Sequence, residues 1–372
     1  SEDATTDLGA SGARFKDLYL SGTVNAASLN IDGGTIKLDG NYPVGTNNVA
    51  LGNTALDSVT SGTRLTAIGS NALTAATSGN YSVAVGSNAL ASATTATFNT
   101  AVGDYALQAA TGGSNTGIGA AALYSTTSGQ YNTALGHSAL QANTTASNNT
   151  AVGYQSLYAN TTGAQLTALG YEAGRNNTTG GFTAVGYRAM YSNTTGNTGV
   201  AIGHDALFAN TTGADNTAVG AYSLKENTTS SQNTAVGYQA LTSQTTGTNV
   251  NTAIGYRALA GGNSSNNYNN TAVGGYALED NIGTNNTAVG RNALLQNTTG
   301  SKNVAIGSIA LDANTTTSEH TAVGYAALSA NSTGLRNTAV GFEAGKSITT
   351  GADNVIVGGD TAASITTGSR NI

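Results

Sequence analysis

A short unit recurs along almost the whole chain, and this recurrence constrains the fold more than any other feature. From about residue 46 onward, an Ala-aliphatic pair is followed by a glycine at 19 positions, and these repeat glycines are 16 to 19 residues apart, most often 17. A fixed short period over most of a chain indicates a solenoid, in which each unit packs only on its neighbours. The repeat glycines are Gly52, Gly69, Gly86, Gly103, Gly119, Gly136, Gly153, Gly170, Gly186, Gly203, Gly220, Gly237, Gly255, Gly274, Gly290, Gly307, Gly324, Gly341 and Gly358.

The residues before each repeat glycine predict a short strand that is apolar on both faces. Val, Ile or Leu directly precedes every repeat glycine, and Ala almost always precedes that residue, as in Ala151 and Val152 before Gly153. Successive side chains of a strand point to opposite faces, so the Ala and the aliphatic residue face opposite sides. One face therefore lines the interior of the coil, and the other must meet a second sheet or another chain.

Each unit also contains a second apolar element and a closing turn. Leu lies four residues after the repeat glycine in 15 of the 19 units, and we expect a second short strand or a single turn there. Asn160-Thr161-Thr162-Gly163 is typical of the turn, because Gly adopts positive φ while Asn and Thr bond to nearby backbone groups. Two strands and two turns fit 17 residues, so we predict an all-β parallel β-roll or β-solenoid of about 19 coils. At roughly 4.8 Å per coil, such a roll is about 90 Å long.

The composition excludes several classes of protein. Charged residues make up only 9% of the chain, and the formal charge of −6 includes no basic stripe, so we expect no nucleic-acid partner. The absence of Cys excludes disulfide frameworks and thiolate metal sites. No run of 18 apolar residues exists, so we expect no helical membrane insertion. We expect neither a cofactor nor a metal.

Residues 1–45 do not follow the period, and we interpret them as an N-terminal β-rich connector that precedes a repetitive roll over 46–372. The stretch 8–22, LGASGARFKDLYLSG, contains a short apolar alternation bounded by glycines, and Pro43, the only proline, marks the boundary. This stretch resembles segments of bacteriophage tail-fibre and other virion proteins. The chain starts at Ser1 and stops inside a further unit, so we expect it to be an excised fragment.

The repeat unit itself resembles the head repeat of trimeric autotransporter adhesins, the YadA-like family. Asn303-Val304-Ala305-Ile306-Gly307 is similar to the Asn-Ser-Val-Ala-Ile-Gly motif of those heads, and the resemblance covers about residues 46–372. It implies a left-handed parallel β-roll, three chains packed side by side, and adhesion. Here the coils are longer, and neither a coiled-coil stalk nor a membrane anchor is present. These departures favour a phage fibre that uses the same roll.

The functional prediction is therefore a non-catalytic structural fibre of a phage virion that extends from the particle and attaches to the host surface. The expected partners are two further copies of the chain in a homotrimer, other virion structural proteins, and a host cell-surface glycan or protein. The first alternative is a trimeric surface adhesin, located on the bacterial cell surface and built on the same roll. The others are a polysaccharide-cleaving tail spike and an ice-binding array, although the adjacent threonines of the turns do not alternate as those of a flat strand do.

Two groups of residues are candidate ligand-binding sites. Tyrosines directly after the repeat glycine predict an aromatic ladder along one edge, which is either structural or a carbohydrate platform. The longest step between repeat glycines predicts an irregular loop, and loops on a rigid scaffold often carry binding sites. The ladder residues are Tyr154, Tyr171, Tyr187, Tyr238, Tyr256 and Tyr325, and the loop residues are Asn263, Asn266, Asn267 and Tyr268.

The ionisable residues offer little chemistry. Glu343 and Asp360 occupy equivalent positions in adjacent coils, as a glycosidase pair requires, but Lys346 lies nearby and we interpret them as solvated side chains. Glu172, Arg188 and Asp205 occupy the same coil position in three consecutive coils, so we expect them to form a ladder of alternating charge. Exposed ion pairs of this kind contribute little to stability. The three histidines, His137, His204 and His320, lie too far apart to share a metal ion. We predict no catalytic residue.

Overall fold

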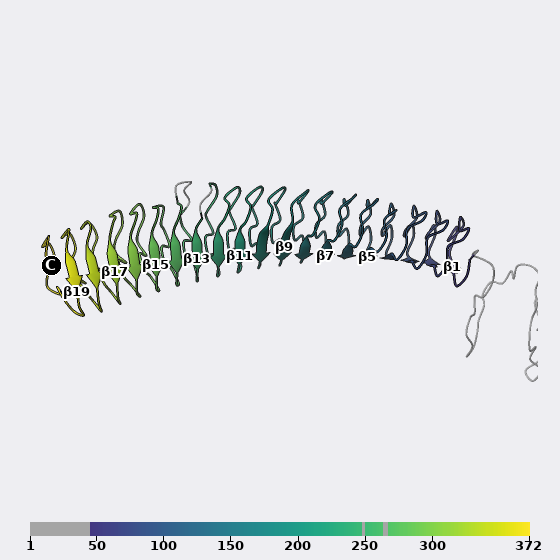
Figure 1. Cartoon of the computed structure of the whole chain (residues 1–372). Helices are drawn as coiled ribbons and strands as arrows, with labels where there is room; N and C mark the ends of the chain where they lie inside the picture. Colours follow the sequence, from purple (N-terminus) through teal and green to yellow (C-terminus); the bar gives the residue numbers. More distant parts are fainter. Residues whose placement is uncertain (1–44, 248–249, 263–266) are drawn as a thin grey trace, which may run out of the picture. The chain divides into compact units, whose positions relative to one another are not determined.

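The computed structural model describes residues 45–247, 250–262 and 267–372, and these residues form a parallel β-solenoid with no helix among them. Nineteen strands follow one another in chain order, and each pairs in parallel with the next (Figure 1). The predicted fold class is confirmed. The predicted N-terminal connector lies outside the described residues except for Gly45.

The strands are short, and each ends directly before a repeat glycine. Seventeen of them contain three residues and two contain four. They are β1 (Val49–Leu51), β2 (Thr66–Ile68), β3 (Val83–Val85), β4 (Thr100–Val102), β5 (Thr116–Ile118), β6 (Thr133–Leu135), β7 (Thr150–Val152), β8 (Thr167–Leu169), β9 (Phe182–Val185), β10 (Gly199–Ile202), β11 (Thr217–Val219), β12 (Thr234–Val236), β13 (Thr252–Ile254), β14 (Thr271–Val273), β15 (Thr287–Val289), β16 (Val304–Ile306), β17 (Thr321–Val323), β18 (Thr338–Val340) and β19 (Val355–Val357).

The second apolar element of each coil is a turn, which is one of the two expected forms, so the described residues form one sheet and the predicted roll with two strands per coil is wrong. Leu157 has a φ of 52°, which lies in the left-handed region and is incompatible with a strand. The backbone here still bonds to the next coil: the Leu157 amide donates to the Ala173 carbonyl at 3.0 Å, and the Ala159 amide donates to the Arg175 carbonyl at 2.9 Å. Alternate amides of the turn thus continue the inter-coil ladder without extended geometry.

The interior of the coil is filled by the strand Ala and the turn Leu. Ala151 and Leu157 are both completely buried, and the same holds for their equivalents along almost the whole stack. Two coils have Gly in place of this Leu, and a large side chain from the next coil fills the space. A Cβ on Gly174 would lie 2.7 Å from Cζ of Phe182, and one on Gly345 would lie 2.8 Å from Cδ1 of Ile356. The core therefore keeps its volume from coil to coil, as close packing requires.

Buried asparagines form two interior columns that bond each coil to its neighbours. In the column before the strand, Asn149 accepts a hydrogen bond from the Leu166 amide of the next coil at 2.9 Å and donates to the Gly163 carbonyl at 2.9 Å. In the turn column, Asn160 donates to the Gly163 carbonyl at 3.0 Å, as predicted, and to Asn143 of the previous coil at 3.4 Å. These amides pair backbone groups that no strand reaches. The positive φ expected at the turn glycine is wrong: Gly163 does not have one, and a Cβ there would instead lie 2.6 Å from Oδ1 of Asn160.

The repeat glycines permit a contact between coils that no other residue allows. Gly136 has a φ of 138°, a region that side chains rarely adopt, and a Cβ added there would lie 2.5 Å from the Gly153 carbonyl oxygen. The equivalent positions along the stack have the same geometry, because each repeat glycine lies against the next one. The glycine of the repeat is therefore required by both backbone conformation and packing.

We predict that Gly136→Ala strongly destabilises the solenoid, by more than about 2 kcal/mol, because it combines a disallowed φ with a backbone clash. Gly275→Ala is the matched control. A Cβ on Gly275 meets its nearest atom, the Tyr256 carbonyl oxygen, at 3.9 Å, so its effect stays within about 0.5 kcal/mol. Chemical denaturation followed by circular dichroism measures both. Equal stability of the two variants would contradict this account of the repeat glycine.

Candidate functional site

The outward face of the sheet is an uncharged strip that runs along all 19 strands. Ala is on the inner face, so the residues on either side of it, Thr or Val before and an aliphatic residue after, point outward. None of these aliphatic residues is buried, and exposure reaches 70% at Val357 in the last strand and 49% at Leu51 in the first. Neither outward position is charged in any strand. The sequence left open which face of the strand would be outside, and the structure places the larger side chains there.

Rings at the end of the strands form a continuous aromatic ladder. Nine rings touch through eight contacts, with centroid separations of 4.9 to 5.8 Å. Five of the six predicted tyrosines belong to it, and Tyr325 pairs separately with Phe342 at 5.4 Å. The nine rings are His137, Tyr154, Tyr171, Tyr187, His204, Tyr222, Tyr238, Tyr256 and Tyr276.

Four rings of this ladder were not among the predicted residues. His137 and His204 occupy the predicted position but are not tyrosines, whereas two tyrosines occupy a different coil position. Tyr222 and Tyr276 lie two residues after their repeat glycine, whereas the predicted tyrosines lie one residue after. The signal that would have found them is the small residue at the usual ring position, Ala221 and Gly275. A shift of one position still leaves each ring in contact with rings of the neighbouring coils, at separations of 5.1 to 5.8 Å.

The regular part of the ladder consists of offset-stacked rings. The planes of Tyr154, Tyr171 and Tyr187 are within 12° of one another at separations of 5.2 Å, and each ring is 42 to 44% exposed. Burial by these neighbours raises the pKa of the Tyr171 phenol, and the Glu172 carboxylate adds to the effect. Each ring face is thus partly covered by the next ring, which stabilises the stack by about 1 kcal/mol per pair.

A cluster of cations and rings adjoins the ladder. The Arg175 guanidinium lies between two rings, 5.1 Å from the centroid of Tyr158 and 5.7 Å from that of Tyr191. The Arg188 guanidinium lies 4.4 Å from the centroid of Phe208. Such cation–π contacts add to the packing of the coils.

The expected charge ladder is formed only in part. Arg188 pairs with Asp205 at 3.3 Å, but Glu172 pairs within its own coil with Arg175 at 3.4 Å. The Asp205 side chain is only 6% exposed, so this pair is not the solvated contact that the sequence suggested. A column of alternating positive and negative side chains, which was not predicted, lies five residues before the repeat glycines. In it, Lys302 pairs with Glu319 at 3.5 Å, and Arg336 pairs with Asp353 at 2.7 Å. The hydrogen bond between the last two raises the pKa of Arg336 and lowers the pKa of Asp353.

The predicted irregular loop contributes little accessible surface in the described residues. Asn263 and Asn266 lie outside them. Asn267 is completely buried and donates to the Gly262 and Asn281 carbonyls at 3.2 and 2.9 Å, so it bonds to its own chain and cannot contact a ligand from solvent. Tyr268 is 40% exposed.

The ionisable groups considered for catalysis are paired or isolated. Lys346 forms an ion pair with Glu343, and its Nζ lies 3.8 Å from Oδ1 of Asp360. Across the described ranges, no group of three His, Cys, Asp or Glu residues is placed to hold a metal ion. His137 and His204 are members of the aromatic ladder.

His320 takes the place of an asparagine in the interior column before the strand. It is 1% exposed, its Nδ1 accepts a hydrogen bond from the Asn337 amide at 3.2 Å, and its Nε2 lies 2.9 Å from the Thr317 hydroxyl. Burial lowers the pKa of His320 from 6.5 to about 4. The imidazole is therefore neutral in the folded state and serves as an asparagine substitute, with Nδ1 as the acceptor.

Comparisons with known proteins returned no relative: no family model, no curated protein and no solved structure matches the chain. Within the described ranges, no helix has the length and apolar character needed to cross a membrane.

We predict a pH-dependent loss of stability that depends on His320. The pKa of this group is lower in the folded state than in the unfolded chain, so the unfolded chain binds the extra proton between pH 6.5 and about 4. Stability therefore falls by about 3 kcal/mol as pH is lowered through this window. Denaturant unfolding at pH 7 and pH 4.5 measures the loss, and His320→Asn, which restores the residue of the other coils, removes it. The interpretation fails if both proteins lose stability equally.

A second prediction concerns Arg188→Glu, which leaves the buried Asp205 carboxylate beside a like charge. We expect a loss of about 2 kcal/mol, because a buried charge loses its partner. Arg336→Glu is the control, since Arg336 and Asp353 are both accessible to water, with side chains 54 and 33% exposed, and the change is small. Thermal unfolding of both variants at low and high salt measures the loss. If Arg188→Glu is as stable as the wild type, the Arg188–Asp205 pair contributes nothing to stability.

Proposed function

We propose that the chain is a structural, non-catalytic fibre segment of a phage virion, assembled as a homotrimer, that extends from the particle and attaches to the host surface. Its partners are two copies of itself, other virion proteins, and a host-surface glycan or protein. The proposal rests on the uncharged outward strip of the sheet. The resemblance of residues 8–22 to phage fibre segments supports the assignment to a virion.

The strip is larger than a soluble monomer normally exposes. It carries outward aliphatic side chains on every strand, and by the strand spacing it is roughly 90 Å long. Contiguous apolar surfaces of this extent mark interaction sites, and depletion of charge is typical of the core of an interface.

A second copy of the chain is the occupant that fits such a strip best. The outward side chains recur once per coil in register, as in Val152 opposite Leu169 and Val219 opposite Val236. An identical strip has the same spacing, so its side chains interdigitate along the whole length, whereas an unrelated partner matches only a few coils. Closed rotational symmetry limits such an assembly to a small number of copies, and the family resemblance implies three.

The surface also supports a mechanical role in preference to catalysis. The two carboxylates considered for glycoside cleavage, Glu343 and Asp360, share Lys346 as their counter-ion. The interior asparagine columns and the repeat glycines bond each coil to the next, which suits a protein that holds its length under load.

The native mass in solution tests the proposal. Light scattering on the eluting peak is expected to give three times 36.7 kDa. Placing lysine at three strip positions, Val152, Val219 and Val289, is expected to give monomers, because the buried charges have no partners. The same change at three outward positions away from the strip, Gln155, Gln239 and Asn292, leaves the trimer intact. A wild-type monomer would overturn the proposed assembly.

Ice binding is a second candidate, favoured by one observation. Strand threonines such as Thr133, Thr150 and Thr167 lie opposite one another in register on the outward face. Turn threonines such as Thr144 and Thr161 are also in register, but their hydroxyls donate to backbone carbonyls of the next coil. Ice binding requires the outward face to be exposed to water, whereas assembly of the trimer buries it, so the two functions exclude each other. A monomer that shows thermal hysteresis would support ice binding, and a trimer without it would exclude this function.

A further inference from the structure

The aromatic ladder changes column at two coils, those of Tyr222 and Tyr276, and a groove forms at the first of them. In the coil of Gly220, the usual ring position holds Ala221, and the ring comes from Tyr222 instead. Tyr222 meets the next ring, Tyr238, at 5.8 Å with an angle of 89° between the planes, whereas neighbouring rings in the regular part are nearly parallel. The small side chain and the turned ring open space between the two coils.

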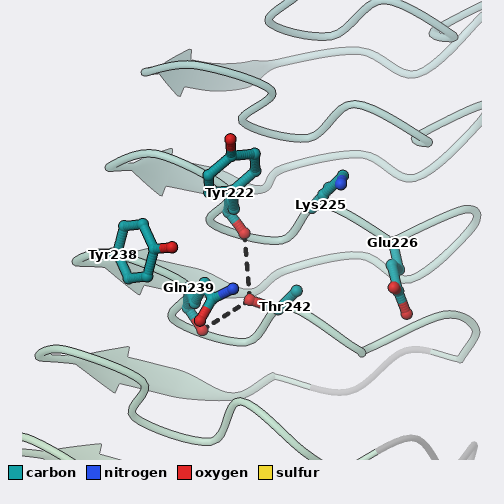
Figure 2. Close-up of a pocket in the computed structure, with 6 residues that line it drawn as sticks. All are labelled: Tyr222, Lys225, Glu226, Tyr238, Gln239 and Thr242. Atoms are coloured by element: carbon teal, nitrogen blue, oxygen red, sulfur yellow. Dashed lines mark hydrogen bonds between the residues drawn. The ribbon is translucent and has the colours of Figure 1, made fainter.

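The resulting groove has a volume of about 340 Å³ and is lined by six residues. Figure 2 shows the two tyrosines at one end and Glu226 at the other, with three polar side chains between them. This size is at the lower end of small-molecule sites. The lining residues are Tyr222, Lys225, Glu226, Tyr238, Gln239 and Thr242.

The polar groups of the groove are available to a ligand. Within the described part of the chain, neither Lys225 nor Glu226 forms an ion pair, although the Lys225 ammonium lies 5.1 Å from the centroid of the Tyr222 ring. By contrast, Arg175 and Arg188 in the neighbouring cluster are paired with carboxylates. The Thr242 hydroxyl donates to the Gln239 carbonyl at 2.7 Å, with the Tyr222 carbonyl at 3.2 Å, and its oxygen can still accept a hydrogen bond. Ammonium, carboxylate, amide and hydroxyl groups thus converge beside two rings.

We propose that this groove binds a single uncharged pyranose residue of a surface glycan. The axial C–H groups of a pyranose pack against the electron-rich face of an aromatic ring, and its hydroxyls both donate and accept. An ammonium and a carboxylate in the same groove can each bond to a different hydroxyl, and together they leave the local charge balanced, which disfavours an anionic sugar. This inference rests on the proposed host-attachment function and locates one contact with the glycan.

The regular ladder is a poorer site for the same ligand. Each of its rings has a nearly parallel neighbour on both sides at about 5.2 Å, as Tyr171 does, so its faces are partly covered. The adjacent cations are already paired. The coil of Tyr222 combines a turned ring, a small residue at the ring position and a cation outside any ion pair of the described residues. At the coil of Tyr276, the residue equivalent to Lys225 is Glu279, which pairs with Arg257 at 2.8 Å.

Saturation-transfer NMR on the full chain tests the groove, with the methyl pyranosides of glucose, galactose, mannose and N-acetylglucosamine as probes. At least one of them is expected to receive saturation. Tyr238→Ser lowers its affinity at least tenfold, and Ala221→Tyr, which restores the regular ring column and fills the groove, has the same effect. The matched control is Tyr325→Ser, since Tyr325 occupies the same coil position and is similarly exposed, 47% against 42% for Tyr238.

The proposal is overturned if no probe is saturated, or if Ala221→Tyr binds as tightly as the wild type. Circular dichroism establishes that each variant is folded. Retention of the labelled chain on bacterial cells distinguishes a failure of the proposed groove from a failure of the proposed attachment function. If cells retain the Ala221→Tyr variant as well as the wild type, the groove is not the binding site and the attachment function stands. If cells retain neither protein although a free sugar is saturated, the attachment function is refuted and the groove stands.

Discussion

The hydrogen bonds that buried asparagines make between coils are the interaction on which the rest of this structure depends. A coil contains only three or four residues of strand, so most of its backbone lies in turns whose amides and carbonyls have no regular ladder. Asn149 and Asn160 supply the missing partners from the inside, and each bridges to a neighbouring coil. An unpaired backbone group buried inside the coil costs about 1 to 3 kcal/mol. The amide side chain, with its acceptor and two donors, is therefore part of the fold and not of the surface.

Inter-coil bonding of this kind fixes the register, and the register then determines the surface. Because equivalent residues lie one strand spacing apart, any side chain that recurs in the sequence becomes a column on the structure. Aliphatic residues become the uncharged strip, tyrosines become the stacked ladder, and alternating charges become the column that includes Arg336 and Asp353. The turn asparagines also match glycosylation sequons, yet Asn160 is completely buried, which makes a structural role sufficient for them.

Much of this was predictable from the sequence, and the failures have physical causes. The period, the parallel stacking and the tyrosine column follow from residue spacing alone. The sequence left open whether the second apolar element is a strand or a turn, and the structure has the turn because Leu157 adopts positive φ, a conformation that Leu propensity does not indicate. The outward face was left open because both Ala and Val are apolar; only the narrow interior, already filled by Leu, decides that the smaller side chain lies inside. Residue spacing does not determine where a side chain points. For this reason the sequence did not predict that Asn267 is buried or that Glu172 pairs with Arg175.

A periodic surface cannot by itself distinguish one point along its length from another. A partner with the same period matches it everywhere, which suits self-association, but a small ligand gains affinity only where several different groups converge. Such convergence requires a departure from the repeat. Ala221 is that kind of departure: it removes a ring from its column, turns the next contact to 89°, and brings Lys225 and Gln239 beside two tyrosines. The cost to the fold is small, since an exposed ring is replaced and no interior asparagine or repeat glycine changes. Recognition can therefore vary at such coils while the assembly of the solenoid is preserved.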